Sequence, residues 1–453
     1  MMKLGKVWML TAVLVLLLAA CGGEAAPEPV AAPTDAPEVE EAVAATEAPP
    51  ATLPPPVVEE AVEAQTEAEE EAPAPEPTAA MVEEEAVVEE VAVGVPDSPW
   101  PAEQFGYGVQ VHGNATVGDP NEIMGTVRNQ LGMDWVKVQV QWFVVEREDR
   151  DQWFFYDAVV ENANKNGVRL LLSVVAAPEW TRASDNHQGP PDDYQNFANF
   201  LNKLIDRYPG QIDGIEVWNE QNLDREWQTA NGVNPEDYVR FLELAYNTIK
   251  AKDPNIIVLS GALAPTGGGD FISWADDFAW LDRALAAGML NFTDCVGAHH
   301  NGYNIGPTVT ADQAPNDPQS ATSVFRGPFD NPHHSWSFKT TLDTYAAKVQ
   351  AVDPNMKLCV TEFGWASNEG YDIWPEGFEF ARDNTLEEQA DFLVQAFQEM
   401  HASGNVWLAF VFNYDFGNKG SGPTDDPVPY SIIDANGVPR PAFGALAEME
   451  KVP

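Results

Sequence analysis

Basic residues are scarce in this sequence of 453 residues. Lysine and arginine together number 24, against 71 aspartates and glutamates, and the formal net charge at pH 7 is −47. Residues 97–453 carry −29 of that charge. Because an acidic surface repels phosphate groups, the composition argues against nucleic acid and anionic lipid as partners.

A long hydrophobic run is also missing. The longest mostly apolar stretch, residues 7–20, has 14 residues, whereas a helix needs about 20 to span a bilayer. Two lysines precede it, as in an export signal, and Leu18-Ala19-Ala20-Cys21-Gly22 resembles a bacterial lipobox, whose cysteine is acylated. We predict a lipoprotein signal peptide over 1–21 and an exported protein held at the cell-surface membrane only by lipid on Cys21. An ordinary signal peptide with an incidental cysteine is the alternative.

Lysine and arginine are absent from residues 22–96, which contain 19 glutamates and one aspartate among many alanines, prolines and valines. The prolines interrupt any apolar period and the like charges repel one another, so this stretch cannot build a packed core. We predict a disordered acidic linker that holds one folded domain, residues 97–453, away from the membrane.

Cysteine occurs only three times. Cys295 and Cys359 both fall inside apolar runs that have the character of strands. A disulfide between them is possible in an exported protein. Free cysteine is among the most buried residue types, however, and we expect two buried thiols.

The folded domain alternates strand-like and helix-like segments. Eight runs have the apolar, β-branched character of buried strands: 107–111, 135–140, 169–175, 215–220, 256–261, 294–299, 356–362 and 406–412. Each is followed by a segment with helical spacing or helix-terminating residues: 120–131, 157–166, 194–207, 235–251, 280–288, 342–352, 385–403 and 441–449. The pattern predicts an α/β protein with a (β/α)8 TIM barrel. A doubly wound sheet is the rival, but Val111-His112-Gly113-Asn114 lacks the glycine-rich phosphate loop expected after its first strand.

Two of the predicted strands end in glutamate. Glu220 closes the fourth and Glu362 closes the seventh, 142 positions later. A barrel keeps its chemistry at the carboxyl ends of its strands, and a pair of carboxylates there is typical of a glycosidase.

These motifs resemble glycoside hydrolase clan A, in particular families 39 and 5. The resemblance rests on Glu216-Val217-Trp218-Asn219-Glu220, on Thr361-Glu362-Phe363-Gly364-Trp365 and on Ala177-Pro178-Glu179-Trp180, and it covers most of residues 105–450. It implies a retaining β-glycosidase in which Glu220 is the general acid/base and Glu362 the nucleophile. Their carboxyl groups should lie about 5–5.5 Å apart, and mutual repulsion should help to keep Glu220 protonated. Asn219 would donate its amide to the sugar 2-hydroxyl.

Further candidate site residues lie at and beyond the end of the sixth predicted strand, outside the two glutamate motifs. His299 closes the sixth strand and is expected to hydrogen-bond a catalytic glutamate or the substrate. Relatives often have His-Pro-Tyr there and this chain has His299-His300-Asn301-Gly302-Tyr303, so Tyr303 is the candidate for the tyrosine that touches the nucleophile. Glu216 is expected to be a buried structural carboxylate paired with Lys137 or Arg169.

Aromatic rings and a long loop complete the expected site. Because sugars stack on aromatic faces, the substrate-binding candidates are four tryptophans near strand ends: Trp180 and Trp365 first, then Trp142 and Trp374. Residues 301–337 form an unusually long connection, which we expect to shape the substrate site. The pairs His299-His300 and His333-His334 suggest a metal, but no ligand spacing supports one, and we expect no metal or cofactor.

A second function class remains open at this stage. The same barrel could serve as a catalytically silent carbohydrate-binding lipoprotein on the cell surface. Two apposed carboxylates and Asn219 disfavour that alternative, because a protein that only binds sugar does not need them. A structural surface protein without a ligand would leave the tryptophans at the strand ends unexplained.

Overall fold

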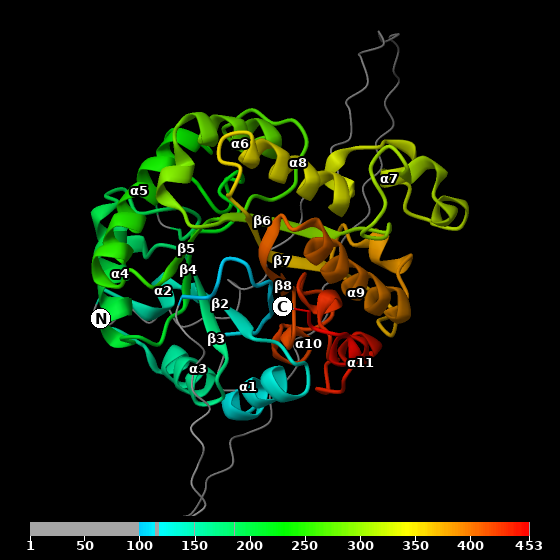
Figure 1. The fold of residues 1–453 in the computed structure, drawn as a ribbon, viewed down its shortest axis with the longest axis horizontal. Helices are drawn as coiled ribbons and strands as arrows, with labels where there is room; N and C mark the ends of the chain where they lie inside the picture. Colours follow the sequence, from blue (N-terminus) through cyan, green and yellow to red (C-terminus); the bar gives the residue numbers. More distant parts are fainter. Residues whose placement is uncertain (1–98, 114–116, 149, 185, 453) are drawn as a thin grey trace, which may run out of the picture. The chain divides into compact units, whose positions relative to one another are not determined.

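The computed structural model describes residues 99–113, 117–148, 150–184 and 186–452. Within them eight parallel strands form one sheet in the order β5-β4-β3-β2-β1-β8-β7-β6, surrounded by helices (Figure 1). The strands are β1 Gly106–Gln110, β2 Trp135–Gln141, β3 Arg169–Val175, β4 Gly214–Val217, β5 Ile257–Ser260, β6 Val296–Gly302, β7 Leu358–Trp365 and β8 Val406–Val411. Each overlaps its predicted position, and the (β/α)8 barrel is confirmed.

Three predictions for the N-terminal part fall outside the described residues. They are the signal peptide over 1–21, acylation of Cys21 and the acidic linker over 22–96. In the part of the chain that the structure describes, no helix is both long enough and apolar enough to cross a membrane.

The helices begin and end close to their predicted bounds. The α-helices are α1 Pro120–Asn129, α2 Trp142–Val145, α3 Phe154–Lys165, α4 Gln195–Arg207, α5 Pro235–Lys252, α6 Asp277–Ala286, α7 Gly327–Asp330, α8 Phe338–Gln350, α9 Leu386–Ser403, α10 Phe416–Lys419 and α11 Pro441–Glu448. Short 3-10 helices are η1 Glu179–Thr181, η2 Met289–Phe292, η3 Ala314–Asn316, η4 Pro318–Ala321, η5 His334–Trp336, η6 Glu379–Arg382 and η7 Val428–Tyr430.

Two helices illustrate how the sequence sets these limits. In α4 the predicted apolar face, Phe197, Phe200, Leu201 and Leu204, is buried against the barrel. Helix α5 starts where Asn234 accepts a hydrogen bond from the Asp237 backbone N–H, which caps an otherwise unpaired donor.

The barrel closes between β5 and β6 through two isolated parallel bridges, Leu259 with Cys295 and Leu263 with Ala298. On the other side of β6, the register with β7 shifts between Ala298 and His299. Beyond the shift, His299 stands opposite Glu362. Irregularities of this kind re-aim side chains next to functional sites.

Cys295 and Cys359 form a disulfide, so the prediction of two free thiols was wrong. They lie in a fully buried apolar cluster inside the barrel, with Trp135, Leu259 and Phe410 among its members. Cys295 directly precedes β6 and Cys359 lies in the neighbouring β7. Their Cα atoms are 5.8 Å apart, which is within the range that a disulfide spans. The sequence placed both cysteines on adjacent strands but did not determine that separation.

The long connection between β6 and α8, residues 303–337, contains η3, η4, α7 and η5. In Figure 1 its α7 segment lies at the edge of the ring of helices. Asp383 holds this connection in place. The Asp383 carboxylate accepts hydrogen bonds at 2.8–2.9 Å from the Val324 and Phe325 backbone N–H groups and from Asn304 Nδ2. The loop is therefore held to the segment that follows β7.

Candidate active site

Glu220 lies just beyond the end of β4, because this strand ends at Val217, three residues earlier than predicted. Both Trp218 (φ 78°) and Glu220 (φ 41°) have left-handed backbone conformations, which are uncommon for residues other than glycine and occur often at functional sites. The Glu220 backbone N–H donates to Ala262 O at 2.8 Å. This turn fixes the direction of a buried glutamate side chain.

Glu362 lies within β7, and His299 joins it to Glu220. His299 Nδ1 lies 3.3 Å from Glu220 Oε1 and 3.8 Å from Glu362 Oε2. These two oxygens are therefore at most about 7 Å apart, a limit that includes the spacing of about 5–5.5 Å found in retaining glycosidases. His299 is buried and contacts Glu220 as predicted.

Lys137 of β2 lies between two buried carboxylates. Its Nζ is 3.1 Å from Glu362 Oε1 and 3.2 Å from Glu216 Oε2. Burial alone would lower the pKa of Lys137, but the charges of both glutamates outweigh it and raise the pKa. The lysine is therefore a buried cation that the two carboxylates share.

Glu216 is the structural carboxylate that the sequence predicted. It pairs with Lys137, and its Oε1 accepts a hydrogen bond from Thr361 Oγ1 at 2.7 Å. Arg169, the other predicted partner, pairs instead with Asp213 at 2.8 Å.

Arg225 was not predicted and changes the electrostatics of Glu220. Its Nη2 lies 2.9 Å from Glu220 Oε2. Burial would raise the pKa of Glu220, but the hydrogen bond with His299 and the charge of Arg225 lower that pKa to about 2. The expectation that repulsion keeps Glu220 protonated was therefore wrong for the free protein, because its partners His299 and Arg225 outweigh the effect of burial.

Two further carboxyl groups lie close to Arg225. Burial raises the pKa of Glu226 to about 8. The charge of Arg225 opposes this shift, and the charges of Glu220 and Glu362 reinforce it. Burial and the neighbouring charge of Asp425 likewise raise the pKa of Asp426 to about 6. Glu226 is thus a carboxyl group that stays largely protonated at neutral pH. The run Asp224-Arg225-Glu226, directly after a predicted catalytic motif, was the only available signal in the sequence.

Asn219 is buried beside Glu220, and its side-chain Oδ1 has no hydrogen-bond partner in the described structure. The same holds for His299 Nε2. Unpaired buried polar atoms are costly in a folded protein. Asn219 adjoins Glu220 in the chain and His299 contacts it, so both atoms can form hydrogen bonds with a bound sugar.

The predicted aromatic residues differ in their surroundings. Trp180 is 46 % exposed and is available for stacking. Trp142 is buried against Phe200, and Trp365 is buried with its indole N–H on Ile305 O. The structure therefore does not support Trp142 and Trp365 as stacking platforms, because both rings are used in packing.

Trp374, the last of the four candidate tryptophans, is only partly exposed. The centre of its ring lies 5.3 Å from the Arg382 guanidinium carbon. Tyr303 packs between the long loop and η6, next to Trp336 and Phe380. A different tyrosine, Tyr430 of η7, lies near the glutamates: burial and then the charges of Asp426, Glu362 and Glu220 raise its pKa.

The sequence matches no protein-family model and no curated protein. Among solved structures, it is similar to a family 39 glycoside hydrolase from the gut symbiont Bacteroides cellulosilyticus WH2, with a TM-score of 0.54 and 20 % identity over 78 % of this chain and 64 % of that one. A monomeric beta-xylosidase from Caulobacter crescentus CB15 gives a TM-score of 0.52 and 17 % identity, over 78 % and 68 % of the two chains.

The catalytic core of a xylanase A gives a TM-score of 0.50 and 16 % identity, over 76 % of this chain and 97 % of that core. The chain thus spans less than two thirds of the family 39 hydrolase and almost all of the xylanase core. At these identities the likeness concerns the fold. The resemblance predicted from the two glutamate motifs is confirmed at that level: the chain has the barrel fold of these glycoside hydrolases.

Proposed function

We propose that this protein is a glycoside hydrolase that cleaves the β-glycosidic bonds of a poly- or oligosaccharide with retention of configuration. The observation that supports this proposal best is the pair Glu220 and Glu362, joined by His299 at the carboxyl end of the barrel. Such a pair provides a nucleophile and an acid/base within one site.

In the first step, a Glu362 carboxylate oxygen attacks the anomeric carbon and Glu220 donates a proton to the departing glycosidic oxygen. The Lys137 ammonium lies 3.1 Å from Glu362 Oε1 and provides a counter-charge beside the nucleophile. Asn219 donates its amide N–H to the 2-hydroxyl, a hydrogen bond that strengthens as positive charge develops on the ring. The products are a glycosyl ester on Glu362 and the leaving alcohol.

In the second step, Glu220 removes a proton from water, which attacks the anomeric carbon and releases Glu362. The free protein holds Glu220 as a carboxylate, which is the form that the second step needs. The first step requires its protonated form, and Arg225 opposes that form. The balance between these two requirements makes Arg225 a residue that sets the pH range of activity.

Replacing Arg225 with Met is expected to move the alkaline limb of the kcat/KM profile to higher pH by at least about one unit. Removal of a nearby positive charge raises the pKa of a carboxyl group by roughly 1–3 units, so Glu220 stays protonated to higher pH. The pH profile with an aryl β-glycoside measures the shift, and Arg225→Lys, which keeps the charge, should stay closer to the parent.

Glu226→Gln separates Glu220 from the other candidate acid. If Glu220 donates the proton, the alkaline limb survives in Glu226→Gln. Glu226 would be the proton donor instead if the alkaline limb of the parent lay near pH 8 and if the Glu226→Gln variant lost that limb.

The proposal includes an exported location. Residues 1–21 would direct export, acylated Cys21 would hold the protein on the membrane, and residues 22–96 would act as a spacer. This arrangement would place the barrel where polymeric sugars outside the cell can reach it. Labelling with a radioactive fatty acid, compared between the parent and Cys21→Ser, tests it.

A substrate screen tests the enzymatic part. We would test the Cys21→Ser chain with xylan, β-glucan, mannan and aryl β-glycosides. Aryl xylosides would be tested first, because two proteins of similar fold are a beta-xylosidase and a xylanase. We expect turnover, and the first product seen by NMR should have the β configuration. An α product would contradict retention, and saccharide binding without turnover across the panel would favour the silent carbohydrate-binding lipoprotein.

A further inference from the structure

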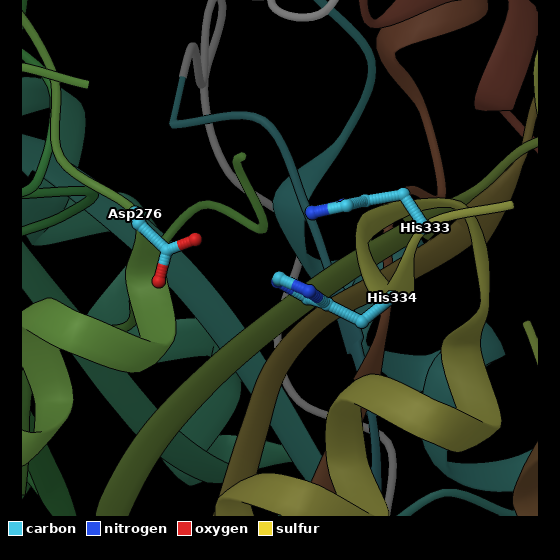
Figure 2. Close-up of side chains that lie close together, drawn as sticks. All are labelled: Asp276, His333 and His334. Carbon is cyan, nitrogen blue, oxygen red and sulfur yellow. The ribbon is translucent and has the colours of Figure 1, made fainter. Parts of the chain in front are cut away.

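A cluster of two histidines and one aspartate lies outside the candidate active site. Asp276 precedes α6, while His333 and His334 lie at the start of η5 in the long connection between β6 and α8. One possible ligand atom of each residue lies within 4.8 Å of the others. Figure 2 shows the Asp276 carboxylate and both imidazole rings in the same space, although the histidines are 57 or more positions away in the sequence.

The ring nitrogens of His334 are divided between two roles. His334 Nε2 lies 2.8 Å from Asp277 Oδ1, and Asp277 Oδ2 accepts a hydrogen bond from the Tyr345 hydroxyl at 2.5 Å. A buried carboxylate that accepts the N–H at one ring nitrogen leaves a lone pair on the other, Nδ1. Histidines that bind metals almost always have a partner of this kind, which fixes the tautomer and the ring.

His333 has a comparable arrangement. Its Nδ1 lies 2.9 Å from Ser335 Oγ and 3.2 Å from the Ser335 backbone N–H. When Nδ1 donates to Oγ, the lone pair lies on Nε2. When a cation binds at Nε2, Nδ1 therefore donates to Ser335 Oγ and no longer accepts from the Ser335 backbone N–H. No further partner is needed.

Asp276 can supply the third ligand without losing its structural role. Its Oδ1 accepts the Ala279 backbone N–H at 2.9 Å and so caps α6, which leaves Oδ2 available. The neighbouring Asp277 adds a second negative charge, and the folded domain is acidic as a whole. Both features favour a cation.

We propose that Asp276, His333 and His334 bind one divalent transition-metal ion, with Zn²⁺ as the ion of choice. Two imidazoles and one carboxylate suit zinc, with a water molecule in the fourth position. Tetrahedral zinc holds its ligand atoms about 3.3 Å apart, given bond lengths of about 2.0–2.2 Å. The ligand atoms therefore need to approach one another by at most about 1.5 Å when the ion binds.

The bound ion would join two connections on the carboxyl side of the barrel, the one that leads into α6 and the one between β6 and α8. The second of these is the 303–337 loop, which starts directly after β6, the strand that carries His299. The ion would hold this loop in place from its C-terminal end, as Asp383 does from its middle. This role goes beyond the proposed glycosidase activity and does not depend on it.

The test uses the full chain with Cys21→Ser, which removes the one cysteine outside the disulfide, after treatment with a chelator. Titration with Zn²⁺ against a chromophoric competitor is expected to give one tight site per chain. Zn²⁺ should also raise the thermal unfolding temperature, and Mg²⁺ should not compete because its preferred ligands are oxygens.

Variants assign the ligands. His333→Gln should weaken Zn²⁺ binding by at least about 100-fold, and Asp276→Asn, which keeps a good helix cap, by about tenfold or more. His187→Gln, a histidine elsewhere in the chain, should bind like the parent. Absence of tight binding in the parent, or unchanged binding in a His333→Gln variant that still unfolds cooperatively, overturns the proposal.

Discussion

Replacement of Glu362 by Gln is expected to lower kcat by at least about a thousandfold, equivalent to about 4 kcal/mol of transition-state stabilisation. The amide is nearly the same size as the carboxylate, but it cannot form the glycosyl ester of a double displacement. Single-turnover and steady-state rates on the best aryl glycoside of the substrate screen measure the loss.

The fold should survive this change. Lys137 keeps a second carboxylate partner, Glu216, at 3.2 Å, so the buried ammonium is not left without a counter-charge. Circular dichroism and thermal unfolding would establish that the variant is folded. A matched substitution at an exposed glutamate after the same strand, Glu376→Gln, should retain the parent rate. A folded Glu362→Gln variant with more than about a tenth of parent activity would rule out Glu362 as the nucleophile.

The two glutamates differ in the cation that each contacts. Glu362 pairs with Lys137, which is itself tied to Glu216 inside the barrel. Glu220 pairs with Arg225, which belongs to the connection after β4 and interacts with Glu226 as well. The proposed nucleophile is thus paired with a residue of the sheet, whereas the proposed acid/base is paired with a residue of the connection after β4.

The strands were predictable because buried parallel strands are continuous apolar runs, and the chain separates them with clear helix caps and glycine turns. The position of both glutamates followed from the same count. The residues that the sequence did not reveal, Arg225, Glu226 and Tyr430, lie in connections, where a side chain gains its role from tertiary neighbours and no periodicity marks it. Tryptophans near strand ends were misleading for a related reason: composition alone does not distinguish a packed indole from an open one.

The disulfide was missed because it depends on register. Cys295 and Cys359 were assigned to adjacent strands six and seven, but a shift of one residue would have pointed one side chain away from the other. The observed bridge agrees with the proposed export, because disulfides persist in oxidising compartments.

Replacement of Lys137 by Met is expected to destabilise the protein by about 3–5 kcal/mol, because it leaves buried Glu216 and Glu362 without their shared cation. The loss should depend on pH. A buried carboxylate without a counter-ion is unfavourable because of its charge, so the loss of stability should be largest at neutral pH and smaller in acid. Urea unfolding at pH 7 and pH 5 measures both effects.

Two further variants make this test specific to the buried charges. Lys137→Met combined with Glu216→Gln should recover part of the lost stability, because only one unpaired carboxylate remains. Lys252→Met, which removes a lysine paired with Asp206 near the surface, should change stability by less than about 1 kcal/mol. A Lys137→Met variant as stable as the parent at pH 7 would show that the lysine does not act as the counter-ion of the two glutamates. The nucleophile would then require another source for its ionised state.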